Sequence, residues 1–279
     1  MAVKIVTDST SDLTPEIAKE LDITVVPLYI HFGDEVYRAG LELSSNDFFD
    51  RLVKSKNLPT TSAPSPGDFL QVYDKLSRET DEILAITISS GVSATYYAAA
   101  EAKNLWRSKT RLEVLDSFSA LMMLGLVVIS AAKAAKAGKT LDEVINVARS
   151  SINRVQLRLA FDTLEYLKKG GRIGAAQAWV GSLLNMNPIL TLKDGKTEPV
   201  TRLRSRTKAV EYLCEFATKF PEIEEVAVED ATTPDEAETI VERISKLVPR
   251  ERIYRTRISP VIGTHVGPRV LGVSVLPVK

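Results

Sequence analysis

The segment Lys4-Ile5-Val6-Thr7-Asp8-Ser9-Thr10-Ser11-Asp12-Leu13 decides the fold, because an apolar run passes directly into a loop rich in short hydroxyl side chains. The apolar run from Val3 to Thr7 predicts a buried strand. After the loop, Thr14 is suited to cap a helix and Pro15 to occupy its first turn. The next apolar run, Ile23 to Ile30, predicts a second strand. A strand, a helix and a strand in this order are typical of a parallel α/β sheet.

Two further apolar runs continue this pattern, Glu82 to Ile88 and Leu112 to Leu115. Helical segments from Thr95 to Trp106 and from Ser119 to Ala137 follow them. Strands that are apolar on both faces are buried on both faces, so we expect helices on both sides of the sheet. The sequence therefore predicts an N-terminal parallel sheet flanked by helices, in a domain that spans residues 1–156.

Capping boxes indicate where two more helices begin. Ser65 precedes Asp68 by three residues, and Thr140 precedes Glu143 by the same spacing. In such a box the hydroxyl and the carboxylate satisfy free N–H groups at the start of a helix. Both helices belong to the predicted N-terminal domain.

The pattern changes at Leu157, where we expect a second α/β domain that spans residues 157–279. A strand from Leu157 to Phe161 and a helix around Ala175 to Leu184 open it. Asp194-Gly195 lies between two strand-like runs, and this dipeptide is a strong hairpin signal. Hairpins make antiparallel sheet, so the second sheet should be mainly antiparallel. The remaining elements are expected as helix, strand, helix, strand and strand, at Thr207 to Phe220, Glu225 to Val228, a helix capped at Thr233, Arg252 to Ile258, and Val270 to Val275.

Composition narrows the class of function. The 279 residues are 44% hydrophobic and 26% charged, and 36 basic residues balance 36 acidic ones, so there is no net basic field for nucleic acid or anionic membranes. One cysteine, Cys214, excludes an intramolecular disulfide and suits a reducing compartment. The longest apolar run, Ala120 to Ile129, is far shorter than the roughly 20 residues that span a bilayer. We therefore expect a cytoplasmic protein.

Motifs for catalysis and cofactors are missing from the sequence. It has no phosphate-binding Walker loop and no dinucleotide-binding glycine fingerprint. His31 and His265 are its only histidines, so the usual His/Cys zinc sets are not available. His265 could activate Ser93, but no nucleophile-elbow sequence surrounds that serine and no acid stands out as a third member. We expect no catalytic residue, no metal and no cofactor.

Three hydroxyl-rich loops point instead to a binding site. They are Thr7 to Ser11, Thr60 to Pro64, and Ser89 to Thr95. Ligands of parallel sheets bind outside the carboxyl ends of the strands, where we expect these loops to gather. Hydroxyl groups beside free N–H groups at helix starts can hold an oxyanion. The sequence thus predicts a site for an acidic head group.

Six motifs are spread over essentially the whole chain: Lys4 to Leu13, Pro59 to Pro64, Ile88 to Tyr96, Leu167 to Ile173, Ala178 to Gly181, and Thr264 to Pro268. In this order and combination they are specific, and they resemble the motifs of the DegV family. The resemblance implies a non-catalytic protein of two α/β domains that holds a long-chain fatty acid between them. It also implies that the protein presents the acyl chain to a separate fatty acid kinase.

The family's motifs also imply which residues bind the ligand. Thr61 and Ser93 would hold the fatty acid carboxyl group, with Ser62 beside Thr61 in the family's Thr-Ser pair. His265 would complete the network at the head group.

Three more residues were assigned from their positions. Ser9 and Thr10 belong to the first hydroxyl loop and are candidate ligand contacts, although capping of their own loop explains them equally well. Arg172 follows two glycines in an expected exposed loop. There it is a candidate contact for the partner kinase, and a solvated surface charge is the alternative.

The chain departs from the family's pattern at two places. Family members usually have Ser-Gly-Thr where this chain has Ser93-Ala94-Thr95, so we expect the added methyl group to alter the head-group geometry slightly. They usually have Gly-Pro-Gly where this chain has Gly267-Pro268-Arg269. We expect Arg269 to add positive charge near His265.

The apolar contacts of the acyl tail are harder to separate from ordinary core residues. The candidates are Leu121, Met122, Met123, Leu126, Ile129, Trp179, Leu183, Leu184 and Met186. Two other functions stay open at this point. One is a stand-alone enzyme that acts on a small acid or phosphate, and the other is a lipid-responsive regulatory protein.

Overall fold

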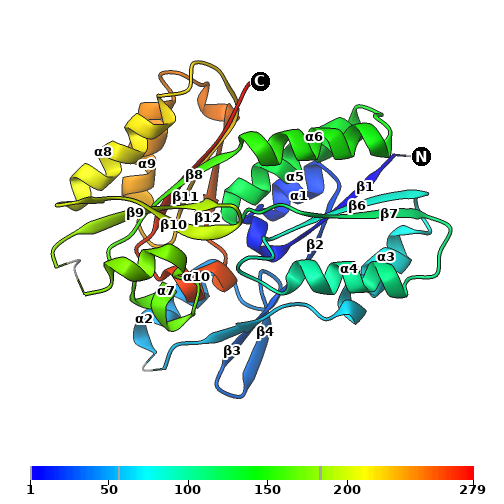
Figure 1. Cartoon of the computed structure of the whole chain (residues 1–279), viewed down its shortest axis with the longest axis horizontal. Coiled ribbons are helices and arrows are strands. Elements are labelled where there is room, and N and C mark those ends of the chain that lie inside the picture. Colours follow the sequence, from blue (N-terminus) through cyan, green and yellow to red (C-terminus); the bar gives the residue numbers. More distant parts are fainter. Residues whose placement is uncertain (1, 56, 182–183) are drawn as a thin grey trace.

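A computed structural model describes residues 2–55, 57–181 and 184–279. Two separate sheets dominate it, one built by the first half of the chain and one by the second (Figure 1). The first is wholly parallel, with the order β2-β1-β6-β7. Its strands are β1 (Lys4–Asp8), β2 (Ile23–Val26), β6 (Glu82–Thr87) and β7 (Arg111–Asp116). The predicted parallel sheet is confirmed.

Helices cover both faces of the parallel sheet, as its apolar strands predict. α3 (Pro66–Leu76) and α4 (Thr95–Leu105) pack on the outer face, around a core that includes Phe69 and Tyr73. α5 (Leu121–Lys136) and α6 (Leu141–Arg154) pack on the inner face. The capping boxes of α3 and α6 form as expected.

The second sheet has the order β10-β9-β8-β13-β11-β12 and is antiparallel except for the β11–β12 pair. Its strands are β8 (Gln156–Ala160), β9 (Asn187–Lys193), β10 (Lys196–Leu203), β11 (Ile223–Asp230), β12 (Ile253–Arg257) and β13 (Leu271–Pro277). Asp194 and Gly195 close the predicted hairpin with φ angles of 49° and 76°, which a two-residue turn of this kind requires. The mainly antiparallel second sheet is confirmed.

α8 (Arg206–Ala217) and α9 (Pro234–Ile244) cover the outer face of the second sheet. They enclose a core of their own that includes Leu213, Val228 and Ile240. A short 3₁₀ helix, η3 (Arg250–Arg252), leads into β12. In Figure 1 these helices lie on the opposite side of the molecule from α3 and α4.

α5 lies between the two sheets and contacts β1, β11 and β13. Almost all of its side chains are buried because both of its sides face apolar layers. A Cβ at Gly125 would stand 2.6 Å from the carbonyl oxygen of Ser11, so only glycine allows this approach of helix and loop. The largest core of the protein therefore joins the two sheets through α5. The predicted boundary at residues 156 and 157 stays a prediction.

A small third sheet with the order β4-β3-β5 was not predicted. The expected single strand from Ile23 to Ile30 is wrong, because it divides at Pro27 into β2 and a strand of another sheet. Proline lacks the N–H that a continuous ladder needs. The strands of this sheet are β3 (Tyr29–Phe32), β4 (Glu35–Arg38) and β5 (Thr60–Ser62). The helix predicted after Thr14 is confirmed as α1 (Pro15–Glu20), whereas α2 (Ser45–Lys54) was not predicted.

Four short elements remain. They are the 3₁₀ turn η1 (Ser9–Ser11) after β1, α7 (Glu165–Lys169), the 3₁₀ helix η2 (Gly174–Trp179), which packs on β10, and α10 (Pro260–Val266). The helix expected around Ala175 to Leu184 is thus a 3₁₀ helix that ends at Trp179. α10 belongs to the C-terminal half of the chain but packs on α2, β3, β5 and η1 of the N-terminal half.

Candidate functional site

A cavity of about 290 Å³ lies where the ends of the two sheets meet α10. Its volume is near the lower end of small-molecule pockets, about 300 Å³. Four predicted site residues and the predicted partner contact line it: Thr61, Ser62, Ser93, His265 and Arg172. Apolar side chains form most of the remaining wall, among them Leu28, Ile88, Leu121, Leu159, Phe161 and Ile262. The cavity therefore has a polar end and an apolar interior.

Thr61 and His265 come together from opposite ends of the chain. Thr61 lies on β5 and His265 on α10, and their Oγ1 and Nε2 atoms are 2.9 Å apart. The contact between α10 and β5 positions both side chains. In a neutral imidazole one nitrogen donates a hydrogen bond and the other accepts one. When Nε2 is the donor, the Thr61 oxygen accepts from it and the Thr61 hydroxyl proton can be donated to another group.

The ring of His265 is neutral at physiological pH. Burial lowers the pKa of His265 to about 4, and the positive charge of Arg172 lowers it in the same direction. Its Nδ1 is buried and has no partner among the described residues. A Cβ at Gly170 would come within 2.3 Å of this nitrogen, so Gly170 lets the chain pass directly over the ring.

Ser93 lies just before the first turn of α4. Its Oγ is 2.9 Å from Thr95 Oγ1 and accepts a hydrogen bond from Thr95 N. Ala94 follows with φ −78°, a conformation that any residue adopts, so its methyl group causes no backbone strain. The expected change in geometry from Ala94 is therefore small, although Ala94 does line the cavity.

Ser62 faces a different partner from that of Thr61. Its Oγ is 2.9 Å from Nε2 of His31, across the β3–β5 pair. Neighbouring residues of a strand point to opposite faces, which separates Thr61 from Ser62. Ser62 thus lines the cavity while its hydroxyl is already hydrogen-bonded.

Arg172 is exposed, as expected, but it also lines the cavity. Its guanidinium donates to the carbonyl oxygens of Val92 (3.1 Å) and Gly170 (2.7 Å). These bonds hold one arginine across the loop before α4 and the loop after α7. Its position joins the head-group end of the cavity to the surface, which the sequence did not predict.

Ser9 and Thr10 do not line this cavity. Thr10 is fully buried and donates its hydroxyl to Asp8, whose other oxygen accepts from Ile88 N at 2.8 Å. The hydroxyl of Ser9 accepts from Leu28 N at 3.0 Å. The Thr10 hydroxyl is bonded within its own loop, as the capping alternative has it, whereas the Ser9 hydroxyl ties the loop to the segment between β2 and β3.

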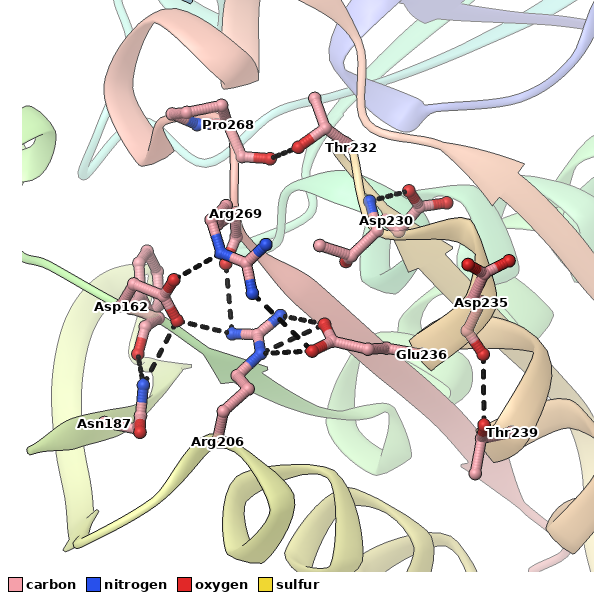
Figure 2. Close-up of polar contacts among 12 residues, drawn as sticks. Asp162, Asn187, Arg206, Asp230, Thr232, Asp235, Glu236, Thr239, Pro268 and Arg269 are labelled. Carbon is pink, nitrogen blue, oxygen red and sulfur yellow. Dashed lines mark hydrogen bonds and ion pairs between the residues drawn. The ribbon is translucent and has the colours of Figure 1, made fainter.

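Arg269 does not act on His265 as expected. Its guanidinium pairs with Asp162 (2.5 Å) and Glu236 (3.6 Å), and Arg206 pairs with the same two carboxylates. Figure 2 shows these two arginines and two carboxylates as one network of alternating charge. Arg269 does not line the cavity, and the charge that lowers the pKa of His265 is that of Arg172.

Most of the predicted tail contacts are ordinary core or surface residues. Of those described, only Leu121 lines the cavity. Met122, Leu126 and Ile129 are fully buried in the core between the sheets, whereas Leu184 is 88% exposed. Leu183 lies outside the described residues. Periodicity placed these residues on apolar faces but did not tell which face adjoins the cavity.

α10 contributes a part of the apolar wall that the sequence did not predict. Val261, Ile262 and Val266 of this helix line the cavity. A signal was present, because Ser259 precedes Pro260 as a cap precedes a proline in the first turn. From Pro260–Val266 the sequence predicts only His265 as a site residue.

The tip of the β9–β10 hairpin fastens the two domains beside the cavity. Ser89 Oγ donates to the carbonyl oxygen of Gly195 at 2.7 Å. A Cβ at Gly91 would stand 2.5 Å from the same oxygen, so the loop before α4 and the hairpin are in direct backbone contact. This contact holds Ser93 at a defined distance from the second sheet.

Two kinds of feature do not occur in the part of the chain that the structure describes. No group of three or more His, Cys, Asp or Glu side chains there is arranged to hold a metal ion. In the same part, no helix has the length and apolar character needed to cross a membrane.

Comparisons with known proteins agree on the family. A family model described as "Uncharacterised protein, DegV family" matches residues 2–278. A DegV domain-containing protein of Clostridium acetobutylicum is 38% identical over 98% of this chain and 97% of its own length. A DegV family protein of Thermus thermophilus, described for its fatty acid binding, is 32% identical with a TM-score of 0.91 and full coverage of both chains. DegV of Bacillus subtilis, described as a fatty acid binding protein, is 32% identical with a TM-score of 0.88 over 99% of both chains. This chain belongs to the DegV family.

Proposed function

We propose that this protein binds one long-chain fatty acid in the cavity, with the carboxyl group at Thr61, Ser93 and His265. The observation that carries the proposal is the polarity of the cavity, which is polar at the end that holds Arg172 and apolar along the rest of its wall. A fatty acid has the same distribution of polarity. The fatty acid binding described for the relatives from Thermus thermophilus and Bacillus subtilis supports it.

The apolar tail supplies most of the affinity in this proposal. Moving one CH₂ group from water into an apolar site is worth roughly 0.8 kcal/mol, so about 15 methylene groups contribute on the order of 12 kcal/mol before the costs of binding. The polar end then has to satisfy the carboxyl group without needing to bind it tightly.

The polar end suits a carboxylate better than a neutral group. Thr61 is hydrogen-bonded to a neutral imidazole, so its hydroxyl proton can be directed to a ligand oxygen when Nε2 of His265 donates to it. Ser93 offers a second hydroxyl, and Arg172 places a positive charge at the same end. We infer that Arg172 compensates the charge of the carboxylate.

We further propose that the protein presents this carboxyl group to a partner fatty acid kinase. Arg172 is exposed as well as lining the cavity, so a partner that approaches the head group meets this side chain. An acidic partner surface would be recognised there, with rim charges that mainly tune the rate of association. A cytoplasmic location fits such a partner and the single buried thiol of Cys214.

The binding proposal is tested by native mass spectrometry of the purified protein, followed by denaturing extraction. We expect one long-chain fatty acid per chain. Purified protein that carries no lipid and then takes up no long-chain acid, saturated or unsaturated, would show that the cavity serves another ligand. A turnover of small acids or phosphates without any partner would favour the stand-alone enzyme.

The presentation proposal is tested with Ser93→Ala and Ser77→Ala, which removes a surface hydroxyl far from the cavity as a matched control. Loss of one hydrogen bond to the ligand costs about 1 to 3 kcal/mol, so Ser93→Ala should retain lipid but release it faster. Acyl phosphate formation with the cognate kinase should fall in this variant only. Binding of lipid without any kinase turnover in the parent protein would instead indicate a regulatory role.

A further inference from the structure

A second hollow of about 680 Å³ separates the outer edges of the two main sheets. We call it the β2–β12 groove, because β2 and β12 are edge strands of their sheets and both contribute to it. Its apolar wall includes Leu13, Ile23, Val25 and Leu41, and Leu41 is 68% exposed. None of the described residues that line the groove also lines the fatty acid cavity. The groove is therefore separate from the site proposed above.

Three polar atoms in the wall of the groove are buried and lack partners among the described residues. They are Thr256 Oγ1, Arg257 Nε and Ser259 Oγ. Asp12 is 5% exposed, Thr256 2% and Ser259 8%. Buried polar groups in proteins almost always have a partner, because an unpaired one costs about 1 to 3 kcal/mol. The Asp12 carboxyl group is hydrogen-bonded to that of Glu229, so three unpartnered atoms remain around the hollow, and they indicate that a ligand completes them.

The charges of the groove indicate what kind of ligand this is. Arg255 is already neutralised by Asp230, and it also donates to the carbonyl oxygen of Thr256. Arg257 is different, because it has no ion-pair partner in the part of the chain that the structure describes. A guanidinium group beside two free hydroxyls is suited to an anion such as a carboxylate, sulfonate or phosphate.

Asp12 does not oppose an anion in this position. Its carboxyl group interacts with that of Glu229, and burial raises the pKa of Asp12 to about 7. Ser259 N donates to Asp12 Oδ1 at 3.1 Å, and the Asp12 carboxyl group is also hydrogen-bonded to that of Glu229. Asp12 therefore has a partner within the protein and is not needed to bind the ligand.

We propose that the β2–β12 groove is a second binding site, for a small amphipathic organic anion. The anionic group lies at Arg257 and Ser259, and the apolar body lies along Leu41, Val25 and Ile23. This site goes beyond the proposed fatty acid function, and a ligand there contacts both domains, since the groove is lined by residues of both sheets.

The probe for the test is 8-anilinonaphthalene-1-sulfonate, which combines an aromatic body with a sulfonate and fluoresces when it is bound in an apolar site. Palmitate is added first, at one equivalent per chain, so that the cavity proposed for the fatty acid is filled and the groove is left open for the probe. We expect saturable binding of the probe to the loaded protein. The absence of saturable binding would overturn the proposal.

Two variants place the probe in the groove. Arg257→Gln should weaken its binding about tenfold, because a charge-assisted contact is lost. Leu41→Glu should weaken it at least as much, and this exposed position tolerates the change without loss of the fold. The matched controls are Arg243→Gln on α9 and Leu247→Glu, an exposed leucine outside the groove, and neither should change the affinity.

Equal affinity in all four variants would overturn the proposal. If the protein fails to bind palmitate, the variants still decide the question, because neither Arg257 nor Leu41 lines the fatty acid cavity. Failure of the groove and failure of the fatty acid site are thereby distinguished. Cooperative thermal unfolding of Arg257→Gln and Leu41→Glu, followed by circular dichroism, provides the check that both variants are folded.

Discussion

Two polar pairs lie between the domains, and in each of them burial shifts a pKa so that the neutral form is favoured. The pairs differ in the groups that surround them. His265 and Thr61 lie at the polar end of the cavity for which we propose fatty acid binding. Asp12 and Glu229 lie where the loop after β1 meets β11, and we call them the carboxyl pair. Burial lowers the pKa of His265 to about 4 and raises that of Asp12 to about 7. Each group is kept neutral because a charged form loses its hydration.

The neighbours explain why one pair suits a ligand and the other suits structure. The nearest charge to His265 is the cation Arg172, at an end of the cavity that still has room for an anion. The carboxyl pair instead accepts from backbone groups of both domains, with Met122 N on Glu229 and Ser259 N on Asp12. Burial raises the pKa of Glu229 well above its usual value, and the charge of Asp12 raises it too. The pair therefore holds the domains together through a shared proton.

The largest expected effect comes from breaking the carboxyl pair with Glu229→Gln. Because the folded state binds protons that the unfolded chain releases above pH about 4, the carboxyl pair makes stability fall as pH rises from about 4 through about 7. The amide cannot ionise, so the cost of keeping Glu229 protonated in the folded state is removed, and the variant should be more stable than the parent at pH 8. Urea unfolding at pH 5 and pH 8 measures it. A variant that is less stable than the parent at pH 8 would contradict a shared proton.

Closing the space over His265 with Gly170→Ala is the next largest effect. The added methyl group would meet Nδ1 at 2.3 Å, although φ of −76° is acceptable for alanine, so the cost is steric. We expect a loss of stability of about 1 to 3 kcal/mol and weaker fatty acid binding. Gly67→Ala in α3 is the control, since its methyl group meets only Ser65 Oγ at 3.5 Å. Thermal unfolding and lipid titration of both variants compare them, and equal behaviour would show that the ring moves freely.

Arg172→Gln changes the charge near His265 without changing its burial. The pKa of His265 should rise from about 4 but stay below 6.5, because burial is the larger cause of its lowering. Stability falls as pH drops from about 6.5 through the folded pKa, because the unfolded chain binds the proton first, so the smaller pKa shift of the variant should cost it less stability in acid than the parent loses. NMR titration of the imidazole signals measures the pKa. Fatty acid binding should weaken severalfold at pH 7, and an unchanged affinity would leave Arg172 with the kinase role alone.

The smallest effect is expected from Arg269→Gln, in the surface network of Figure 2. Arg269 is half exposed, and exposed ion pairs contribute only about 0.2 to 1 kcal/mol. The matched comparison is Arg206→Gln, because Arg206 pairs with the same carboxylates but is only 16% exposed. Arg206→Gln should destabilise the protein more, while neither variant changes lipid binding. A loss of lipid binding in Arg269→Gln would restore a role for it at the head group.

Local sequence patterns were sufficient for much of the fold. Continuous apolar strands separated by helices predicted the parallel sheet, and Asp194-Gly195 predicted the hairpin of the second sheet. Capping boxes at Ser65 and Thr140 predicted the first turns of two helices. Each of these patterns involves residues that are close in the sequence. Their backbone hydrogen bonds form in the same way in most folds, so the patterns can be interpreted without knowledge of distant contacts. Pro27 was the exception, because the sheet to which each half of that run belongs depends on distant strands.

Some features of the site could likewise be predicted from local sequence, and others depend on contacts between distant residues. Sequence patterns were enough to predict the hydroxyl residues and, through the family's motifs, the set Thr61, Ser93 and His265 that the structure brings to one cavity. Folding in three dimensions was needed to bond Thr10 within its own loop and Ser9 to Leu28, to bring Arg172 to the cavity, and to add α10 to its wall. The buried carboxyl pair also emerged only there, since its residues are far apart in the sequence. Burial and contacts between distant residues set these roles, and neither is encoded in the spacing of residues along the chain.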